Sequence, residues 1–262
     1  MTVEAIRTPA RERLAIGAAL VLITLLGWAY MLRMARGAPE HGHGHMDLIA
    51  MPAPSGWDWQ LLGLSATMWC VMMTAMMLPS AAPMVLSFAR VHARRRLQGG
   101  AVVPTGIFVA GYLAAWCAFG VVAAVAQMAL HEAALLSSPM GSLGAQSGGV
   151  LLIAAGLVQF SPLKTACLEK CRTPLSFLLA EWREGRTGAV VMGLRHGASC
   201  VGCCWALMLL MFVGGVMNLL WMAALTLLVL LEKVVPDGHA FGRVSGVVLI
   251  VGGIWVLGAA LI

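Results

Sequence analysis

The sequence predicts an all-α integral membrane protein, a polytopic bundle of about seven transmembrane helices. Hydrophobic residues make up 60% of the 262 residues and charged residues only 11%, with a mean hydropathy of +0.88. Soluble domains are about 45–50% apolar and about 25% charged, so water is a poor solvent for most of this chain. A span needs about 20 apolar residues, which leaves room for six to eight spans and for no sizeable soluble domain.

Seven apolar runs are long enough, or nearly long enough, to cross the hydrocarbon of a bilayer. The first is longer than a signal-peptide core and lacks a cleavage site before Arg33, so we expect it to be retained. Gly214-Gly215 interrupts the last long stretch and predicts a helical hairpin. The predicted spans are 14–32, 61–89, 104–130, 143–160, 189–213, 216–231 and 244–262.

The basic residues predict an orientation in a bacterial-type inner membrane. With the hairpin in place, all but two basic groups fall on one side of the bundle, and only Arg33 and Arg36 lie on the other. The positive-inside rule then makes the N-terminus cytoplasmic and the C-terminus external. The net charge of +6 follows from this placement and requires no nucleic-acid partner; the lipid bilayer is the expected partner. The cytoplasmic groups are Arg7, Arg11 and Arg13; Arg90, Arg94, Arg95 and Arg96; Lys164 through Arg195; and Lys233 with Arg243.

Two parts of the chain are expected. Residues 1–60 form the first span and an external loop, in which Glu40 to Met46 contains three His that are able to gather divalent metals. Residues 61–262 form a six-helix membrane domain. Between its spans 143–160 and 189–213, Ser161-Pro162 and Thr173-Pro174 each place a capping hydroxyl before a proline and predict two short cytoplasmic helices, the second ending at Gly185.

The main candidate site is His196, Cys200, Cys203 and Cys204, near the cytoplasmic start of span 189–213. Offsets of 4, 7 and 8 residues put all four side chains on one helix face, within roughly an 80° arc. Free thiolates on the cytoplasmic side stay reduced, and thiolate ligands select copper(I) or zinc. The alternative is that Cys serves only as a small apolar residue between helices.

A second pair, Cys167 and Cys171, lies on the first short helix at a spacing that places both sulfurs on one face. We expect one or both to lie near the face of Cys200, as additional ligands or as a point of metal uptake. Two inert surface thiols, or a transient disulfide, are the alternative.

Methionines form two adjacent stripes on span 61–89, which include Met72, Met73, Met76 and Met77. Thioethers are soft ligands that are able to relay Cu(I), although Met also serves as adaptable packing material. On span 216–231, the boundary pair Glu232-Lys233 is interpreted as an interfacial anchor rather than as a buried proton carrier. Neither a phosphate-binding loop nor an intramembrane carboxylate pair is present, which argues against an ATP-driven or proton-coupled pump.

Several strings together resemble the domain of unknown function 2182, described as predicted metal-binding integral membrane proteins. The resemblance covers roughly Gln60 to the C-terminus and implies a class of protein but no established reaction. It is carried by Met68-Trp69 to Pro79, Cys167 to Leu175, His196 through Trp205, Asn218 to Met222 and Glu232-Lys233.

The leading hypothesis is a membrane-embedded soft-metal protein, a metal handler or transporter rather than an enzyme, with copper(I) as the ion and zinc as the alternative. A metal chaperone or a periplasmic protein is the expected partner. A membrane redox enzyme that uses the same Cys is a second hypothesis. An assembly or scaffold protein that binds no metal is a third. Metal analysis separates the third from the others, and turnover with a quinone or thiol separates the second.

Overall fold

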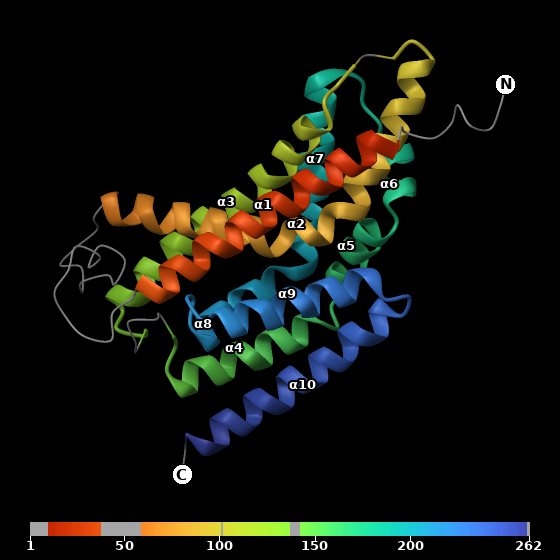
Figure 1. The fold of residues 1–262 in the computed structure, drawn as a ribbon. Helices are drawn as coiled ribbons and strands as arrows, with labels where there is room; N and C mark the ends of the chain where they lie inside the picture. The colour runs from red at the N-terminus through yellow and green to blue at the C-terminus, as the bar shows by residue number, and fades with distance from the viewer. Residues whose placement is uncertain (1–9, 38–58, 101, 137–141, 261–262) are drawn as a thin grey trace.

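The chain is mainly helical over the described residues 10–37, 59–100, 102–136 and 142–260 of a computed structural model, which contain no β-strand (Figure 1). This confirms the all-α class. The helices are α1 (Ala10–Gly37), α2 (Trp59–Leu97), α3 (Thr105–Glu132), α4 (Ala145–Val158), α5 (Pro162–Arg172), α6 (Pro174–Glu181), α7 (Gly185–Leu209), α8 (Met211–Gly214), α9 (Leu219–Val234) and α10 (Gly238–Ala259).

Five segments of the described chain are long and apolar enough to cross a membrane: α1, α2, α3, the α7–α8 stretch and α10. The α4–α5 pair adds a sixth if it is one span broken by a 65° bend. All seven apolar runs are therefore helical, but α4 and α9 have only 14 and 16 residues. A straight 16-residue helix rises about 24 Å, which is less than the hydrocarbon thickness of about 30 Å. The expected count of seven spans is thus not confirmed by helix length.

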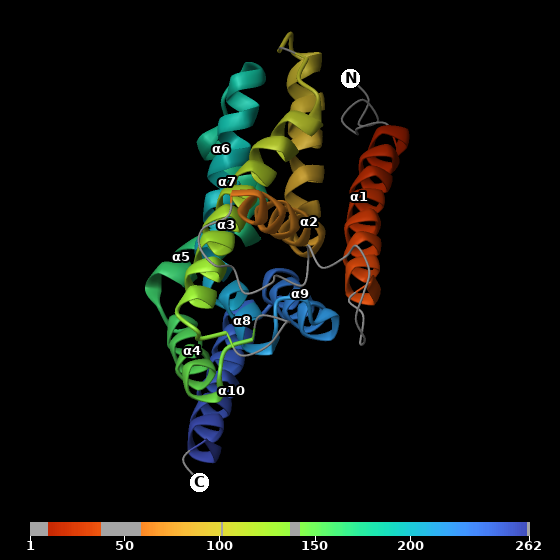
Figure 2. The same cartoon turned by 90° about the vertical axis from the view of Figure 1, so that its left-hand side faces the viewer.

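The helices form two groups that meet at α5 and α9. In one group α3 packs along both α7 and α2, and α1 lies outside against α2 (Figure 2). In the other, α4 and α9 pack against α10. Helix α5 contacts both α7 and α9. The short helices α5 and α6 therefore lead the chain from α4 back to α7 (Figure 1).

Polar caps fix several of these boundaries. The Ser161 hydroxyl accepts a hydrogen bond from the Lys164 amide at 3.1 Å, as expected for a cap before a proline. Asn218 caps α9 in the same way, after Gly215 has reversed the chain with a φ of +90°. Thr173 differs from expectation, because its hydroxyl donates back to the Glu169 carbonyl at 2.8 Å and makes no cap bond. Helix α6 also ends at Glu181, before the expected Gly185.

Glycines bring α3 and α7 unusually close. A Cβ at Gly197 would lie 2.7 Å from Ala115 Cβ and 2.9 Å from the Tyr112 carbonyl oxygen. A Cβ at Gly193 would collide with the Phe108 carbonyl oxygen. Small residues of this kind allow helix backbones to touch where lipid supplies no hydrophobic drive for association. The α3–α7 contact therefore fixes the face of α7 that carries the candidate site.

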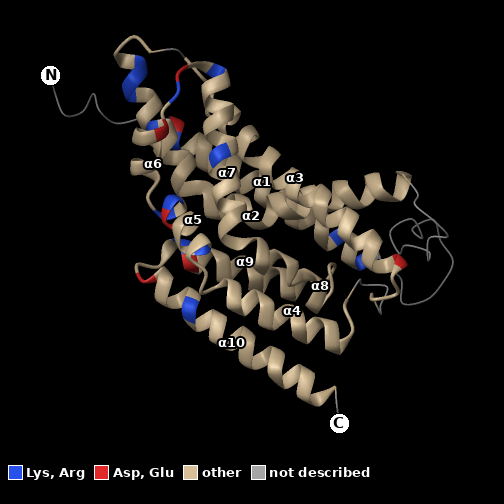
Figure 3. Cartoon of the chain, turned by 180° about the vertical axis from the view of Figure 1, so that it is seen from behind, with Lys and Arg blue, Asp and Glu red and all other residues tan. Residues whose placement is uncertain are grey.

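Lys and Arg gather along one edge of the molecule, where α2 ends and where α5 and α6 lie (Figure 3). The last turn of α2 carries Arg94, Arg95 and Arg96, while α1 ends with Arg36 at the opposite end of the fold. The expected one-sided distribution is thus visible in the fold.

Candidate metal centre

Three thiols and an imidazole lie buried on one face of α7. His196, Cys200, Cys203 and Cys204 are each no more than 3% exposed. The thiols of Cys203 and Cys204 donate to the Cys200 carbonyl oxygen, at 3.1 and 2.8 Å. The expectation that this face points into the helical bundle is confirmed.

Helix α5 adds two more thiols to this face. Helix α5 packs against α7, and the Cys171 side chain lies within interaction range of the thiols of Cys200 and Cys203. Cys167 lies over Gly202, where an added Cβ would come within 2.8 Å of its Sγ. The expected convergence of the two sequence motifs is therefore observed: Cys171, Cys200, Cys203 and Cys204 form one group of free thiols, with Cys167 at its edge.

The Cys200 sulfur is in contact with two residues that were not among the expected ligands. The Lys233 ammonium, from the end of α9, lies 2.9 Å from Cys200 Sγ and donates to Ser80 Oγ at 2.9 Å. The Tyr112 hydroxyl, from α3, lies 3.2 Å from the same sulfur and 3.1 Å from the Met77 carbonyl oxygen. Charged and polar side chains inside apolar spans are costly unless they serve a purpose. Tyr112 lies inside the predicted span 104–130, so this rule marks it as a candidate without naming its partner. Lys233 lies beyond the predicted span 216–231 and gives no such signal.

The imidazole of His196 is enclosed by aromatic rings. Its centroid lies 5.6 Å from those of Tyr112 and Phe177, and 6.2 Å from that of Phe108. Its Nδ1 is buried and has no hydrogen-bond partner. A buried nitrogen with a free lone pair or proton is unusual in proteins, and one turn from Cys200 it is available to a metal or to a small ligand.

The methionines of α2 are buried in the same core as the thiols. Met72, Met73, Met76 and Met77 are each at most 1% exposed. The contact with the thiol group runs through the Met77 carbonyl and through Ser80, one turn further on, next to Pro79. Pro79 and Pro83 lie within α2, which changes direction along its length (Figure 2); such prolines remove hydrogen bonds and bend a helix.

Glu232 does not behave as an interfacial anchor. It is 1% exposed and forms an ion pair with the equally buried Lys164 of α5, at 2.7 Å. Ser245 of α10 donates to the same carboxylate at 3.3 Å. The interpretation of Glu232-Lys233 as an anchor was therefore wrong, because consecutive helical residues point about 100° apart and each of these two meets a different buried partner.

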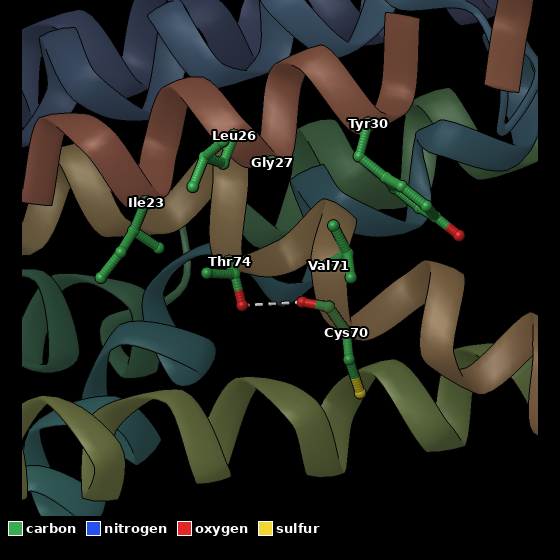
Figure 4. Close-up of a pocket in the computed structure, with 7 residues that line it drawn as sticks. All are labelled: Ile23, Leu26, Gly27, Tyr30, Cys70, Val71 and Thr74. Atoms are coloured by element: carbon green, nitrogen blue, oxygen red, sulfur yellow. Dashed lines mark hydrogen bonds between the residues drawn. The ribbon is translucent and has the colours of Figure 1, made fainter. Parts of the chain in front are cut away.

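The remaining cysteines lie elsewhere. Cys70 and Cys117 form a separate contact between α2 and α3, with Cys70 Sγ 3.7 Å from the Cys117 carbonyl oxygen. A cavity of about 380 Å³ beside Cys70 is lined almost entirely by apolar side chains of α1 and α2. In Figure 4 the Thr74 hydroxyl bonds to the Cys70 carbonyl while the Cys70 thiol points away toward α3. This cavity shares no residue with the thiol group.

The donor chemistry of the thiol group fits a soft, monovalent ion. Several thiols and an imidazole nitrogen without a partner lie close together away from the surface, and such soft donors favour Cu(I) over harder ions. Among the described residues, no three His, Cys, Asp or Glu side chains form a ready-made metal site. The external His tract, Glu40 to Met46, lies outside the described residues.

The fold and the thiol group define a helical protein with membrane-compatible helices and soft donors held between them. Residues 66–256, well over half of the chain, match the family described as PpoB2, copper chaperone, and the chain belongs to that family. Copper handling is thereby supported, and nothing supports zinc. The match names a different family from the domain of unknown function 2182, so that resemblance stays a prediction. No curated protein and no solved structure matches the chain.

Proposed function

We propose that this protein binds Cu(I) within the membrane at the thiol group of α5 and α7 and passes it to a partner protein. The single observation that carries the proposal is the convergence of Cys171 from α5 with Cys200, Cys203 and Cys204 from α7. Membership of a copper chaperone family indicates copper as the metal. Soft thiolates in an apolar setting supply the preference for its monovalent form.

In this proposal Cys200 and Cys171 are the principal ligands. The thiols of Cys203 and Cys204 donate hydrogen bonds to the Cys200 carbonyl oxygen. Cys171, in contrast, approaches the Cys200 sulfur from a different helix. His196 supports them with its unpartnered nitrogen. Cys167, at the edge of the group, receives or releases the ion.

The methionine stripes on α2 serve as a relay in the same scheme. Met72, Met73, Met76 and Met77 are buried next to one another and lead along α2 toward Ser80. A thioether binds Cu(I) without adding charge, so an ion is able to move along such a ladder with little electrostatic cost.

The membrane arrangement that we propose is seven spans with a cytoplasmic N-terminus and an external C-terminus in the cell inner membrane. It counts α9 and the bent α4–α5 pair as spans. The gathering of Lys and Arg at one edge of the fold supports it (Figure 3). The thiol group would then take copper near the cytoplasmic face, and the partner would be a metal chaperone or a periplasmic protein.

The test is copper stoichiometry of the full chain purified in detergent under reducing conditions. After loading with Cu(I) and removal of free ion, we expect about one copper per chain in the wild type and a loss of most of it in a Cys171→Ser/Cys200→Ser variant. X-ray absorption at the copper edge identifies sulfur neighbours at the site. Equal copper content in the two proteins would sink the proposal.

The matched control is Cys70→Ser/Cys117→Ser, which removes two partly buried thiols that lie outside the thiol group, where the Cys70 thiol contacts the Cys117 carbonyl oxygen. We expect this variant to keep its copper. If it loses copper as fully as the Cys171→Ser/Cys200→Ser variant does, the binding is non-specific.

A further inference from the structure

The strongest feature that copper binding by thiols leaves unexplained is the half-buried cation at the Cys200 sulfur. Lys233 reaches this sulfur at 2.9 Å from α9, although α9 makes only limited contact with α7. Its second partner, Ser80 at 2.9 Å, belongs to α2. Three helices thus hold one ammonium against one sulfur in an apolar interior.

We propose that Lys233 is the built-in counter-ion of the copper-loaded site and that it makes the site selective for a monovalent over a divalent ion. This inference rests on the proposed function, since it takes Cys200 and Cys171 as the ligands.

The argument is a charge count. Cu(I) held by two thiolates carries a net charge of −1, which is costly to bury alone in a medium of low dielectric constant. The ammonium of Lys233 brings the sum to zero. A divalent ion on the same two thiolates is already neutral, and the ammonium then leaves one uncompensated positive charge beside it.

Neighbouring ionic groups do not supply this charge in place of Lys233. The buried ammonium of Lys164 forms an ion pair with the Glu232 carboxylate at 2.7 Å. Arg172, on the same helix as Cys171, donates to the Glu232 carbonyl oxygen at 2.6 Å and so points toward the end of α9. The Lys233 ammonium, in contrast, meets a hydroxyl and a sulfur.

Ser80 and Tyr112 hold this arrangement in place. Ser80 accepts from Lys233 and donates to the Met77 carbonyl oxygen at 2.8 Å, which anchors the ammonium to α2. The Tyr112 hydroxyl approaches the sulfur from α3. The ammonium is consequently fixed at the sulfur before any ion arrives, and no reorganisation is required when the negative charge develops.

The experiment compares Cu(I) with Cd²⁺, a soft divalent ion, on the full chain in detergent, with affinities measured by competition against chelators. Lys233→Met removes the charge and keeps the length of the side chain. We expect it to weaken Cu(I) binding by about 10- to 100-fold, the effect of about 1.4–2.8 kcal/mol, and to leave Cd²⁺ binding unchanged or tighter. We expect Lys233→Arg to keep Cu(I) binding within about threefold of the wild type.

Lys170→Met is the matched control, because it removes an exposed positive charge next to Cys171. It is expected to change neither affinity. Equal losses for Cu(I) and Cd²⁺ in Lys233→Met, with no rescue by Arg, would mean that Lys233 only maintains the fold, and the inference would be wrong. Unchanged Cu(I) binding in that variant would also overturn it.

Failure of the proposed function gives a different result. In that case the wild type itself holds no more Cu(I) than the Cys171→Ser/Cys200→Ser variant does. The two proposals are therefore tested separately on the same set of proteins.

Discussion

Glu232 and Lys233 are neighbours on α9, yet they take part in two different kinds of ionic contact, the first buried and the second half-buried. Glu232 meets the ammonium of Lys164 at 2.7 Å, and both side chains are almost completely buried. Lys233 meets a sulfur and a hydroxyl. The first contact is complete, because cation and carboxylate neutralise each other. The contact of Lys233 leaves the positive charge of its ammonium available to a bound ligand. We therefore regard the Glu232 contact as structural and the Lys233 contact as functional.

The Lys164–Glu232 pair joins α5, α9 and α10, since Ser245 also donates to the carboxylate. Its disruption is the largest effect that we expect. Lys164→Met strands a buried carboxylate, and removal of one partner of a buried pair costs about 3–5 kcal/mol. We predict a large fall in melting temperature in detergent, with copper affinity nearly unchanged in the protein that remains folded.

The control for Lys164→Met is the double variant Lys164→Met/Glu232→Leu. Replacement of both partners by apolar groups of similar size is often neutral, so we expect most of the stability to return. Should Lys164→Met melt with the wild type while losing copper, the division between a structural and a functional contact would be wrong.

The α3–α7 crossing holds the functional contact together, and the second prediction tests it. Gly197→Ala places a Cβ 2.7 Å from Ala115 Cβ and 2.9 Å from the Tyr112 carbonyl oxygen. We expect it to push the helices apart at a cost of about 1–3 kcal/mol and to weaken Cu(I) binding as well, because Tyr112 retreats from Cys200. Gly252→Ala on α10, where an added Cβ meets no atom within 4 Å, is the control and is expected to change neither property.

Tyr112→Phe is the third prediction and removes only the hydroxyl at the Cys200 sulfur. The Met77 carbonyl keeps its bond from Ser80, so the variant leaves that acceptor satisfied. Loss of one hydrogen bond to the sulfur is worth about 1 kcal/mol, or about a fivefold weaker affinity for Cu(I) in chelator competition. A tighter affinity would instead mean that the hydroxyl competes with the ion for the sulfur.

The sequence predicted the elements well because their causes are local. The apolar runs, the prolines after Ser161 and Thr173, and the break at Gly214-Gly215 each act within a few residues, and the helices follow them. The shared face of Cys200, Cys203 and Cys204 follows from helical periodicity alone. The approach of Cys171 to α7 could be predicted because only one short helix, α6, separates α5 from α7 along the chain.

The polar partners could not be predicted, because their positions depend on how distant helices cross. Tyr112 and Lys233 lie 88 and 33 residues from Cys200 along the chain, and no local pattern links them to it. For the same reason Lys164 was expected among the cytoplasmic basic residues and Glu232 at the membrane boundary, although the two form a buried ion pair. Charged residues at the ends of apolar runs are ambiguous until packing decides whether they face water or one another.

The smallest effect is expected from Ser80→Ala, which tests how Lys233 is held. Ser80 accepts from the Lys233 ammonium at 2.9 Å and donates to the Met77 carbonyl oxygen at 2.8 Å. Without it the ammonium keeps its contact with Cys200 but loses its anchor on α2. We expect Cu(I) affinity to fall by about two- to threefold, at the low end of what one hydrogen bond contributes, and Ser80→Thr to restore it.

The matched control for Ser80→Ala is Ser65→Ala, on the same helix. The Ser65 hydroxyl is buried and has no hydrogen-bond partner, so its removal breaks no bond and relieves a buried polar group. We expect unchanged Cu(I) affinity and an equal or slightly higher melting temperature. If the two alanine variants bind Cu(I) equally well, the ammonium is held by Cys200 alone, and the contact at Lys233 depends on fewer helices than the geometry implies.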